Sequence, residues 1–204
     1  MTAVRYEAWL VDLDGTLYAP GPVKLAMAAE LLLSGWGAIG TLRRFRLEHE
    51  RLRREQDGAD PPSGDPFAAQ LRRTADALSL ELSAVEDCVR EWMFERPGKW
   101  LRPVRRSALL NEIADFRAAG GRTAVVSDYP ARHKLRALGA ESLFDVVVAS
   151  GEPDGPSRLK PDPEGYLRAA ERLGVPPQRC LVIGDRDDAD GAAAAAAKMA
   201  FRHV

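Results

Sequence analysis

Two aspartates follow an apolar run near the start of the chain. Residues 9–11 (Trp-Leu-Val) are typical of a buried strand, and Asp12, Asp14 and Gly15 come directly after them. Side chains alternate along an extended chain, so Asp12 and Asp14 point to the same side at the carboxyl end of the strand, where open α/β sheets bind ligands. Such a close pair of like charges either shares a cation or divides the roles of nucleophile and proton carrier. The alternative is an Asx-turn, with Asp14 capping the next segment of the chain.

A second acidic group comes after another short apolar run, near the other end of the chain. The run 180–183 ends at Gly184, and four carboxylates come within the next six residues: Asp185, Asp187, Asp188 and Asp190. Carboxylates at this density repel one another unless a cation lies among them. Oxygen ligands without histidine or cysteine favour a hard ion, and Mg²⁺ is the common case. The alternative is a solvated acidic turn in which Asp190 helps to cap a helix over 191–197.

A hydroxyl and an ammonium group lie between the two acidic groups in sequence. Ser127 follows the apolar run 123–126, and Lys160 stands in the stiff, proline-containing segment LKPDP. Beside carboxylates and Mg²⁺ they make a phosphate site, because Ser127 donates a hydrogen bond and Lys160 balances the charge that develops on the transferring group. Taken separately, Ser127 would be an N-cap and Lys160 a surface lysine. The order of all four features along the chain favours the chemistry.

These four motifs resemble those of the haloacid dehalogenase (HAD) superfamily, in the same order. The first motif, DxDGT, is at residues 12–16, and the fourth, GDxxxxD, is at residues 184–190. The second is Ser127, and the third is Lys160 in its LKPDP context. The resemblance covers the chemistry-bearing segments, each of which follows an apolar run.

The resemblance implies a role for each matching residue. Asp12 would be the nucleophile that forms an aspartyl-phosphate, and Asp14 the acid/base. Mg²⁺ would be bound by Asp12, the backbone carbonyl of Asp14 and Asp185, with Asp190 in support. Asp188 is a rival for that last role, because the spacing within the fourth motif varies. The substrate phosphate would be bound by Thr16, Ser127 and Lys160.

The elements that must position these residues can be predicted from hydrophobic periodicity. Residues 19–103 show only helical patterns, with helices expected at 23–34, 41–56, 66–80 and 83–95 and breaks at 35–37 and 57–66. The rest alternates: helices near 107–119, 132–138, 163–174 and 191–197, and strands at 9–11, around 123 and 181, and at 145–149 and 199–203. We expect Ser83 and Glu86 to form a capping box, and Asp162 to cap a helix that starts at Pro163.

The alternation predicts an α/β fold with helices on both faces of a parallel sheet. We expect a three-layer, Rossmann-like core from residues 1–18 and 104–204, as in the HAD fold, and an inserted α-helical cap domain at 19–103. In that superfamily such an insert closes over the active site and selects the substrate.

The predicted cap helix at 41–56 is amphipathic. An apolar stripe is formed by Leu42, Phe45, His49 and Leu52, and arginines cover much of the remainder. We expect Arg43, Arg44 or Arg46 to bind an anionic part of the substrate, the alternative being a solvated basic face. His49 is expected in the core, and Tyr18 and Tyr129 either line the pocket or pack.

Composition limits the partners of this chain. It has 204 residues, 46% of them hydrophobic, and a formal net charge of -1. That balance is ordinary for a soluble globular protein and argues against a nucleic-acid partner, which normally requires a strong positive excess. No segment is apolar enough to predict a membrane span. Cys88 and Cys180 are expected to be packing residues in a reducing compartment, which favours a cytoplasmic protein. The oligomeric state is left open.

The function expected from this sequence is Mg²⁺-dependent hydrolysis of a small phosphorylated metabolite. Dehalogenation would need neither the metal nor a second acid. A phosphomutase of the same superfamily is an alternative, since it differs only in how well the aspartyl-phosphate is shielded from water. A phosphonate-cleaving enzyme would need a cap lysine, and nothing marks Lys24 or Lys99 for that role. A non-catalytic module that binds Mg²⁺ or phosphorylated ligands is a further alternative.

Overall fold

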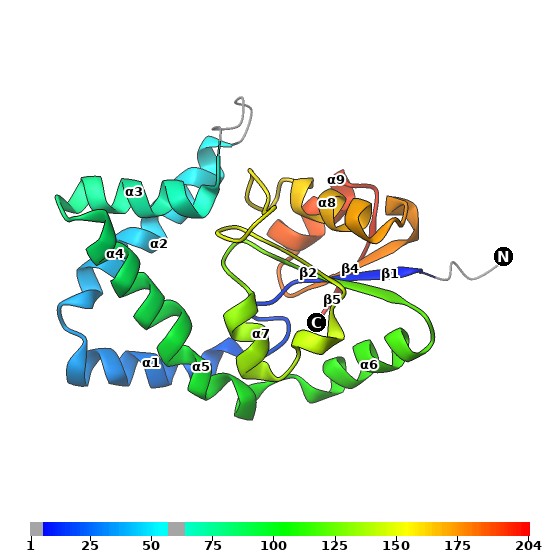
Figure 1. The fold of residues 1–204 in the computed structure, drawn as a ribbon, viewed down its shortest axis with the longest axis horizontal. Helices are drawn as coiled ribbons and strands as arrows, with labels where there is room; N and C mark the ends of the chain where they lie inside the picture. Colours follow the sequence, from blue (N-terminus) through cyan, green and yellow to red (C-terminus); the bar gives the residue numbers. More distant parts are fainter. Residues whose placement is uncertain (1–5, 57–63) are drawn as a thin grey trace.

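A computed structural model describes residues 6–56 and 64–204 and contains one parallel sheet (Figure 1). The strand order is β3-β2-β1-β4-β5. The strands span β1 (Ala8–Val11), β2 (Arg122–Ser127), β3 (Val146–Ala149), β4 (Cys180–Gly184) and β5 (Ala200–His203). From β1 the chain adds β2 and β3 on one side, and then β4 and β5 on the other side of β1. The order in which strands are added therefore reverses beside β1, and ligands of open α/β sheets bind at such a point.

The strand register brings three of the four motifs to one edge. Val11 pairs with Val125 of β2 and with Ile183 of β4. The backbone N–H of Asp12 then donates to the carbonyl of Ile183 at 2.9 Å, which continues the ladder past the end of β1. The segments after these strands therefore leave the sheet side by side.

Helices cover both faces of the sheet, so the predicted three-layer α/β class is confirmed (Figure 1). One face packs against α8 (Glu164–Leu173) and α9 (Ala192–Ala196), and the other against α6 (Ser107–Ala118) and α7 (Arg132–Leu138). Short turns of helix precede β3, β4 and α9: η3 (Glu141–Leu143), η4 (Pro177–Arg179) and the π-helical η5 (Asp187–Gly191).

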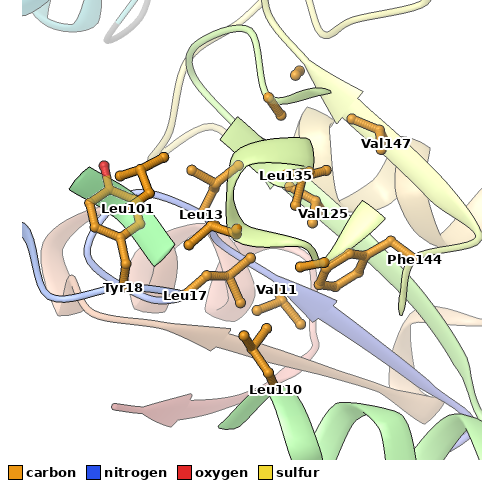
Figure 2. Packing of buried hydrophobic residues seen from close by; sticks show 14 of the residues in the cluster. Val11, Leu13, Leu17, Tyr18, Leu101, Leu110, Val125, Leu135, Phe144 and Val147 are labelled. Carbon is orange, nitrogen blue, oxygen red and sulfur yellow. The ribbon is translucent and has the colours of Figure 1, made fainter. Parts of the chain in front are cut away.

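Apolar residues anchor the turn that carries the two aspartates. Figure 2 shows Val11, Leu13 and Leu17 packed toward Leu110 and Leu135 in one hydrophobic cluster. Leu13 and Leu17 are fully buried, and each such side chain contributes about 1.5–3 kcal/mol when it leaves water. Since Leu13 separates Asp12 from Asp14, its burial holds both carboxylates at the sheet edge.

Helices fill most of the segment between β1 and α6 (Figure 1). They are α1 (Pro20–Ser34), α2 (Ala38–Glu55), α3 (Pro66–Leu78), α4 (Leu82–Val89), the π-helical η1 (Arg90–Glu95), α5 (Arg96–Leu101) and η2 (Arg102–Val104). The apolar stripe expected on α2 is buried, with Phe45 packed against Leu71 and Val85 in a core of its own. Among all the described residues, no helix is long and apolar enough to cross a membrane.

Three local predictions are wrong. Helix continues beyond Glu95 through α5, because Pro97 lies in the first turn of α5, where its missing N–H breaks no hydrogen bond. The capping box does not form: α4 begins at Leu82, so Ser83 is already inside the helix.

The start of α8 also differs from the prediction. The helix begins at Glu164 with Pro163 as its N-cap residue, although Asp162 still accepts a hydrogen bond from the Glu164 N–H at 2.8 Å. The loop predicted at 57–66 falls mainly outside the described residues.

Candidate active site

Asp12 lies at the carboxyl end of β1, in the middle of the sheet. It is buried, and Lys160 donates from Nζ to Asp12 Oδ1 at 2.5 Å. The other carboxylate oxygen, Oδ2, is also buried and has no hydrogen-bond partner among the described residues. Burial raises the pKa of Asp12 to about 7, because the charge of Lys160 lowers it only in part and that of Asp190 raises it further. Oδ2 therefore offers an unused acceptor to a ligand.

Lys160 connects two of the acidic motifs. Its buried ammonium donates to Asp12, to Asp190 Oδ1 at 2.8 Å and to the carbonyl of Val126 at 3.2 Å, so all three of its N–H groups have acceptors. Its backbone is fixed as well, since Asp128 accepts from its N–H at 3.1 Å and Arg53 donates to its carbonyl at 2.9 Å. The lysine is thus placed rigidly against the carboxylates.

Asp190, and not Asp188, lies in this cluster. The π-helical turn of η5 brings it back against Gly184, where a Cβ atom would stand 2.5 Å from Asp190 Cγ. Asp190 accepts from Lys160, from the Tyr166 hydroxyl at 2.7 Å and from the N–H of Arg186 at 3.3 Å. The side chain of Asp188 is 66% exposed and pairs with Arg186.

Asp185 comes directly after β4 and lies against the first motif. It lies directly beside Gly15, whose φ of +100° suits glycine and where a Cβ atom would be only 2.1 Å from Asp185 Oδ2. Thr16 Oγ1 is 3.5 Å from Asp185 Oδ1. Carboxylate oxygens of Asp12, Asp185 and Asp190 all lie within 4.8 Å of one another, which is the spacing of a candidate metal site.

Asp14 is held by two residues, one of which the sequence analysis did not find. Lys134 Nζ lies 2.7 Å from both carboxylate oxygens of Asp14, and the Tyr18 hydroxyl donates to Oδ1. Burial opposes ionisation of Asp14, but these two partners hold its pKa below the usual value. The available signal was a lysine in the buried stripe of α7, four residues before Leu138.

The second motif, Ser127, is the last residue of β2. Ser127 is buried, and its Oγ accepts from the N–H of Tyr129 at 3.2 Å. This bond uses an oxygen lone pair and leaves the hydroxyl hydrogen for a ligand. Tyr129 stacks on His49 of α2 with ring centroids 4.7 Å apart, so the residues after Ser127 contact α2.

The three arginines expected to bind substrate are not joined to the carboxylate cluster. Arg43 and Arg46 are exposed, and Arg44 pairs with Glu48 on the same helix at 2.7 Å. Burial raises the pKa of Tyr129, and the charge of Arg46 opposes this rise only weakly. The third motif is contacted from α2 by Arg53, about two helical turns beyond Arg46.

Gln56, which comes directly after α2, contacts the segment of the third motif, a contact that was not predicted from the sequence. Its Oε1 accepts from the N–H of Leu159 at 2.9 Å. Arg53 and Gln56 continue the face of α2 that carries His49, and this i, i+4, i+7 spacing was the signal present in the sequence.

The comparisons with known proteins agree with this geometry. The sequence model of the haloacid dehalogenase-like hydrolases matches residues 6–198. N-acetylmuramic acid 6-phosphate phosphatase of Pseudomonas aeruginosa is 30% identical over 100% of this chain and 84% of its own length. A phosphoglycolate phosphatase of Nitrosospira multiformis is 32% identical over 93% of this chain and 79% of its own. Fructose-1-phosphate phosphatase of Escherichia coli is 26% identical over 94% and 93%.

Solved structures share the fold. A HAD phosphatase from Thermococcus onnurineus superimposes with a TM-score of 0.64 at 23% identity, covering 97% of this chain and 86% of that one. L-2-haloacid dehalogenase from Xanthobacter autotrophicus gives the same TM-score at 21% identity, covering 98% and 77%. At these identities the likeness establishes the architecture alone, and the two proteins differ in the chemistry that their names state.

Proposed function

This chain belongs to the haloacid dehalogenase-like hydrolases, and from that membership we propose that it is a Mg²⁺-dependent phosphatase of a small phosphate monoester. Its curated relatives over nearly the whole length are phosphatases, so the chain is a hydrolytic enzyme of this class. The observation that carries the proposal is the buried Oδ2 of Asp12, which has no hydrogen-bond partner among the described residues and lies where the first, third and fourth motifs meet.

Asp12 is the proposed nucleophile. Its Oδ2 forms a bond to phosphorus while the bond from phosphorus to the leaving oxygen breaks, which gives an aspartyl-phosphate. Lys134 and Tyr18 stabilise Asp14 as a carboxylate, so it acts as the acid only once it has bound a proton. It then gives this proton to the leaving oxygen and takes one from the water that releases inorganic phosphate. Asp12 and Asp14 are two positions apart on the same turn, which supports this division of tasks.

The chain's own residues fit a hard divalent cation. Asp12 and Asp185 would hold Mg²⁺ together with the backbone carbonyl of Asp14. The oxygens of Asp190 already accept three hydrogen bonds, so its proposed role is to orient Lys160 against Asp12. When bound, Mg²⁺ neutralises phosphate charge and brings the phosphorus toward the nucleophile.

Lys160, Ser127 and Thr16 are the proposed phosphate-binding residues. The Lys160 ammonium lies against Asp12, where it balances the charge that grows on the transferring phosphoryl oxygens. Ser127 can donate the hydroxyl hydrogen that its contact with Tyr129 leaves unused.

Residues 19–103 are proposed to form the cap over this site. They reach the motif segments at Arg53, against the Lys160 carbonyl, and at Gln56, against Leu159. A third contact is made by Asp65, which accepts from the Gly151 N–H at 2.9 Å. A cap that touches these loops excludes water from the transfer and contacts the leaving group.

Hydrolysis of p-nitrophenyl phosphate with Mg²⁺, with excess chelator, and by Asp12→Asn tests the proposal. Activity must require the metal and fall by at least about a thousandfold in the variant, because asparagine keeps the shape but is not a nucleophile. Undiminished turnover of Asp12→Asn would exclude the mechanism, and no turnover by the wild type on any ester would favour a non-catalytic module.

A mutase is separated from a phosphatase by the fate of the phosphoryl group. Hydrolysis releases inorganic phosphate in proportion to the alcohol, whereas a mutase returns the group to a second hydroxyl. Measuring both products for a sugar phosphate decides between the two.

A further inference from the structure

Lys134 is a buried cation that the proposed mechanism leaves unused. It lies on α7 with only 7% of its side chain exposed, whereas the carboxylate of Asp14, with which it pairs, is 32% exposed. Two of its N–H groups are directed at the two oxygens of Asp14. Within residues 6–56 and 64–204, no third oxygen or nitrogen accepts from Nζ, and the Phe94 ring lies 5.6 Å away. A buried ammonium with an unused donor is costly unless a ligand supplies an acceptor.

We propose that Lys134 is a specificity-determining residue that binds a carboxylate on the leaving group of the substrate. The substrate class is a phosphate ester whose carboxylate is attached to the ester carbon itself, so that the two groups are separated by one carbon. This inference rests on the proposed phosphatase function and names the side of the site where the leaving group is recognised.

Distances around Asp14 support this assignment. A leaving oxygen that is hydrogen-bonded to Asp14 lies about 3 Å from one of its carboxylate oxygens. Both of these oxygens are 2.7 Å from Lys134 Nζ, so the leaving oxygen lies within about 6 Å of the ammonium. With standard bond lengths, a carboxylate one carbon away has an oxygen about 3 Å from the ester oxygen. Such a carboxylate can reach the ammonium while the ester oxygen contacts Asp14.

The surroundings of Lys134 discriminate against neutral leaving groups. Phe94 comes from η1 of the proposed cap and is buried, as is Tyr18 on the other side of Asp14. An alkyl group placed here would leave the third N–H of the ammonium without an acceptor, which is unfavourable, and a hydroxyl group would accept from it only as a neutral group. A carboxylate instead forms a charge-assisted hydrogen bond.

Arg53 is a weaker candidate for the same role. Its guanidinium already donates to the Lys160 carbonyl and lies near Glu50 and Asp188, at 3.5 and 3.7 Å. These contacts hold the Arg53 guanidinium between the Lys160 carbonyl and Asp188. Lys134 is beside the acid/base, where the leaving group departs.

Two esters of equal length test the inference: 2-phosphoglycolate, which carries the carboxylate, and 2-hydroxyethyl phosphate, which carries a hydroxymethyl group in its place. We expect wild-type kcat/KM to favour the carboxylate ester. Lys134→Met should lower this preference by about 10- to 100-fold, the loss expected for one charged hydrogen bond, and Lys134→Arg should retain most of it.

Tyr18→Phe is the matched control. It removes a hydrogen bond to Asp14 without removing a cation, so it should slow both esters by a similar factor and keep their ratio. A preference that persists in Lys134→Met, or that is lost equally in Tyr18→Phe, would overturn the inference and leave Lys134 as a positioning residue for Asp14.

Binding measurements decide the matter if turnover of Lys134→Met is too low to measure. In the Asp12→Asn background, calorimetry with each ester in Mg²⁺ should show tighter binding of 2-phosphoglycolate, lost when Lys134→Met is added. Equal affinities with and without Lys134 would refute the inference. Wild-type hydrolysis of p-nitrophenyl phosphate without any carboxylate preference would refute it while the phosphatase proposal stands, and absence of all hydrolysis would refute that proposal instead.

Discussion

Charged side chains differ in burial between the carboxyl edge of the sheet and α2. At the sheet edge, Asp12, Lys160 and Asp190 are buried against one another and share short hydrogen bonds. On α2, Arg43 and Arg46 are exposed, and Arg44 pairs with an acid on its own helix. The first arrangement is expensive to disturb because each charge depends on its neighbours, whereas water already surrounds the exposed arginines of the second.

This contrast predicts in which region a substitution changes the free energy of unfolding most. Buried charges are retained at a cost in stability, and in an enzyme such a cost is usual at the site of chemistry. The two regions should therefore respond very differently to single substitutions, and measuring the free energy of unfolding in both is a direct test of the comparison.

Lys160→Met should give the largest loss of stability. It leaves two buried carboxylates without their cation, and removing one partner of a buried pair costs about 3–5 kcal/mol. Denaturant unfolding in chelator measures the loss. Because Mg²⁺ bound to Asp12 and Asp185 would supply positive charge, the loss should be smaller when the metal is present. An equal loss with and without Mg²⁺ would contradict the proposed metal site.

The pH dependence of stability should identify Asp12. Its pKa is raised to about 7 in the folded chain, whereas in the unfolded chain it titrates near 3.8. Between these values the folded state binds more protons, so ionisation of Asp12 reduces the free energy of unfolding as pH rises from about 4 to 7, by about 2–4 kcal/mol.

Asp12→Asn removes this contribution. In chelator, the stability of Asp12→Asn relative to wild type should therefore increase from about pH 4 to 7 and stay constant above that range. The exposed Asp188 provides the control, since Asp188→Asn should show no such rise between about pH 5 and 7.5. A flat difference for Asp12→Asn would show that Lys160 keeps the carboxylate ionised throughout.

Asp190→Asn and Asp188→Asn form a matched pair within one turn. Asp190 accepts from Lys160 and Tyr166 in a buried setting, so its neutral variant should lose about 1.5–3 kcal/mol and most of the phosphatase activity. Asp188 is exposed, and its variant should change stability by less than about 0.5 kcal/mol. Unfolding curves and Mg²⁺-dependent turnover of both variants measure this. Equal activity losses would mean that Asp188 also serves the metal.

The strand ends at the carboxyl edge of the sheet could be predicted from the sequence because they are marked by neighbouring residues. An apolar run that ends in Asp12 or Asp185 marks both a strand and the place where the chain leaves it, and parallel packing then brings these ends together. Helix positions could be predicted for the same reason, since amphipathic stripes such as the one through Phe45 are written into consecutive residues.

The partners of these residues could not be predicted in the same way. Lys134 meets Asp14 across 120 positions of sequence, and only the packing of α7 against the β1 turn brings them together. Likewise, the choice of Asp190 over Asp188 depends on the π-helical turn at 187–191, whose extra residue per turn rotates the side chains relative to an α-helix. Contacts made by tertiary packing leave no periodic signal in the chain.

The smallest effects should come from Arg43→Gln and Arg46→Gln on α2. Both side chains are exposed, so each substitution should change the free energy of unfolding by less than about 0.5 kcal/mol. They differ in their relation to Tyr129, just after the second motif: burial raises the pKa of this phenol, and the charge of Arg46 weakly opposes the rise. We therefore expect Arg43→Gln to leave kcat/KM unchanged for every ester, and Arg46→Gln to lower kcat/KM for 2-phosphoglycolate, which carries an added carboxylate, more than for p-nitrophenyl phosphate.

Arg44→Gln adds a useful third case. Arg44 and Arg51 both pair with the buried Glu48, so loss of Arg44 is partly compensated and should affect stability more than catalysis. Comparing kcat/KM for 2-phosphoglycolate and p-nitrophenyl phosphate across the three variants separates binding from packing. If all three substitutions lower kcat/KM for 2-phosphoglycolate alike, α2 acts as a diffuse basic surface that attracts the substrate. That effect should then disappear as ionic strength is raised.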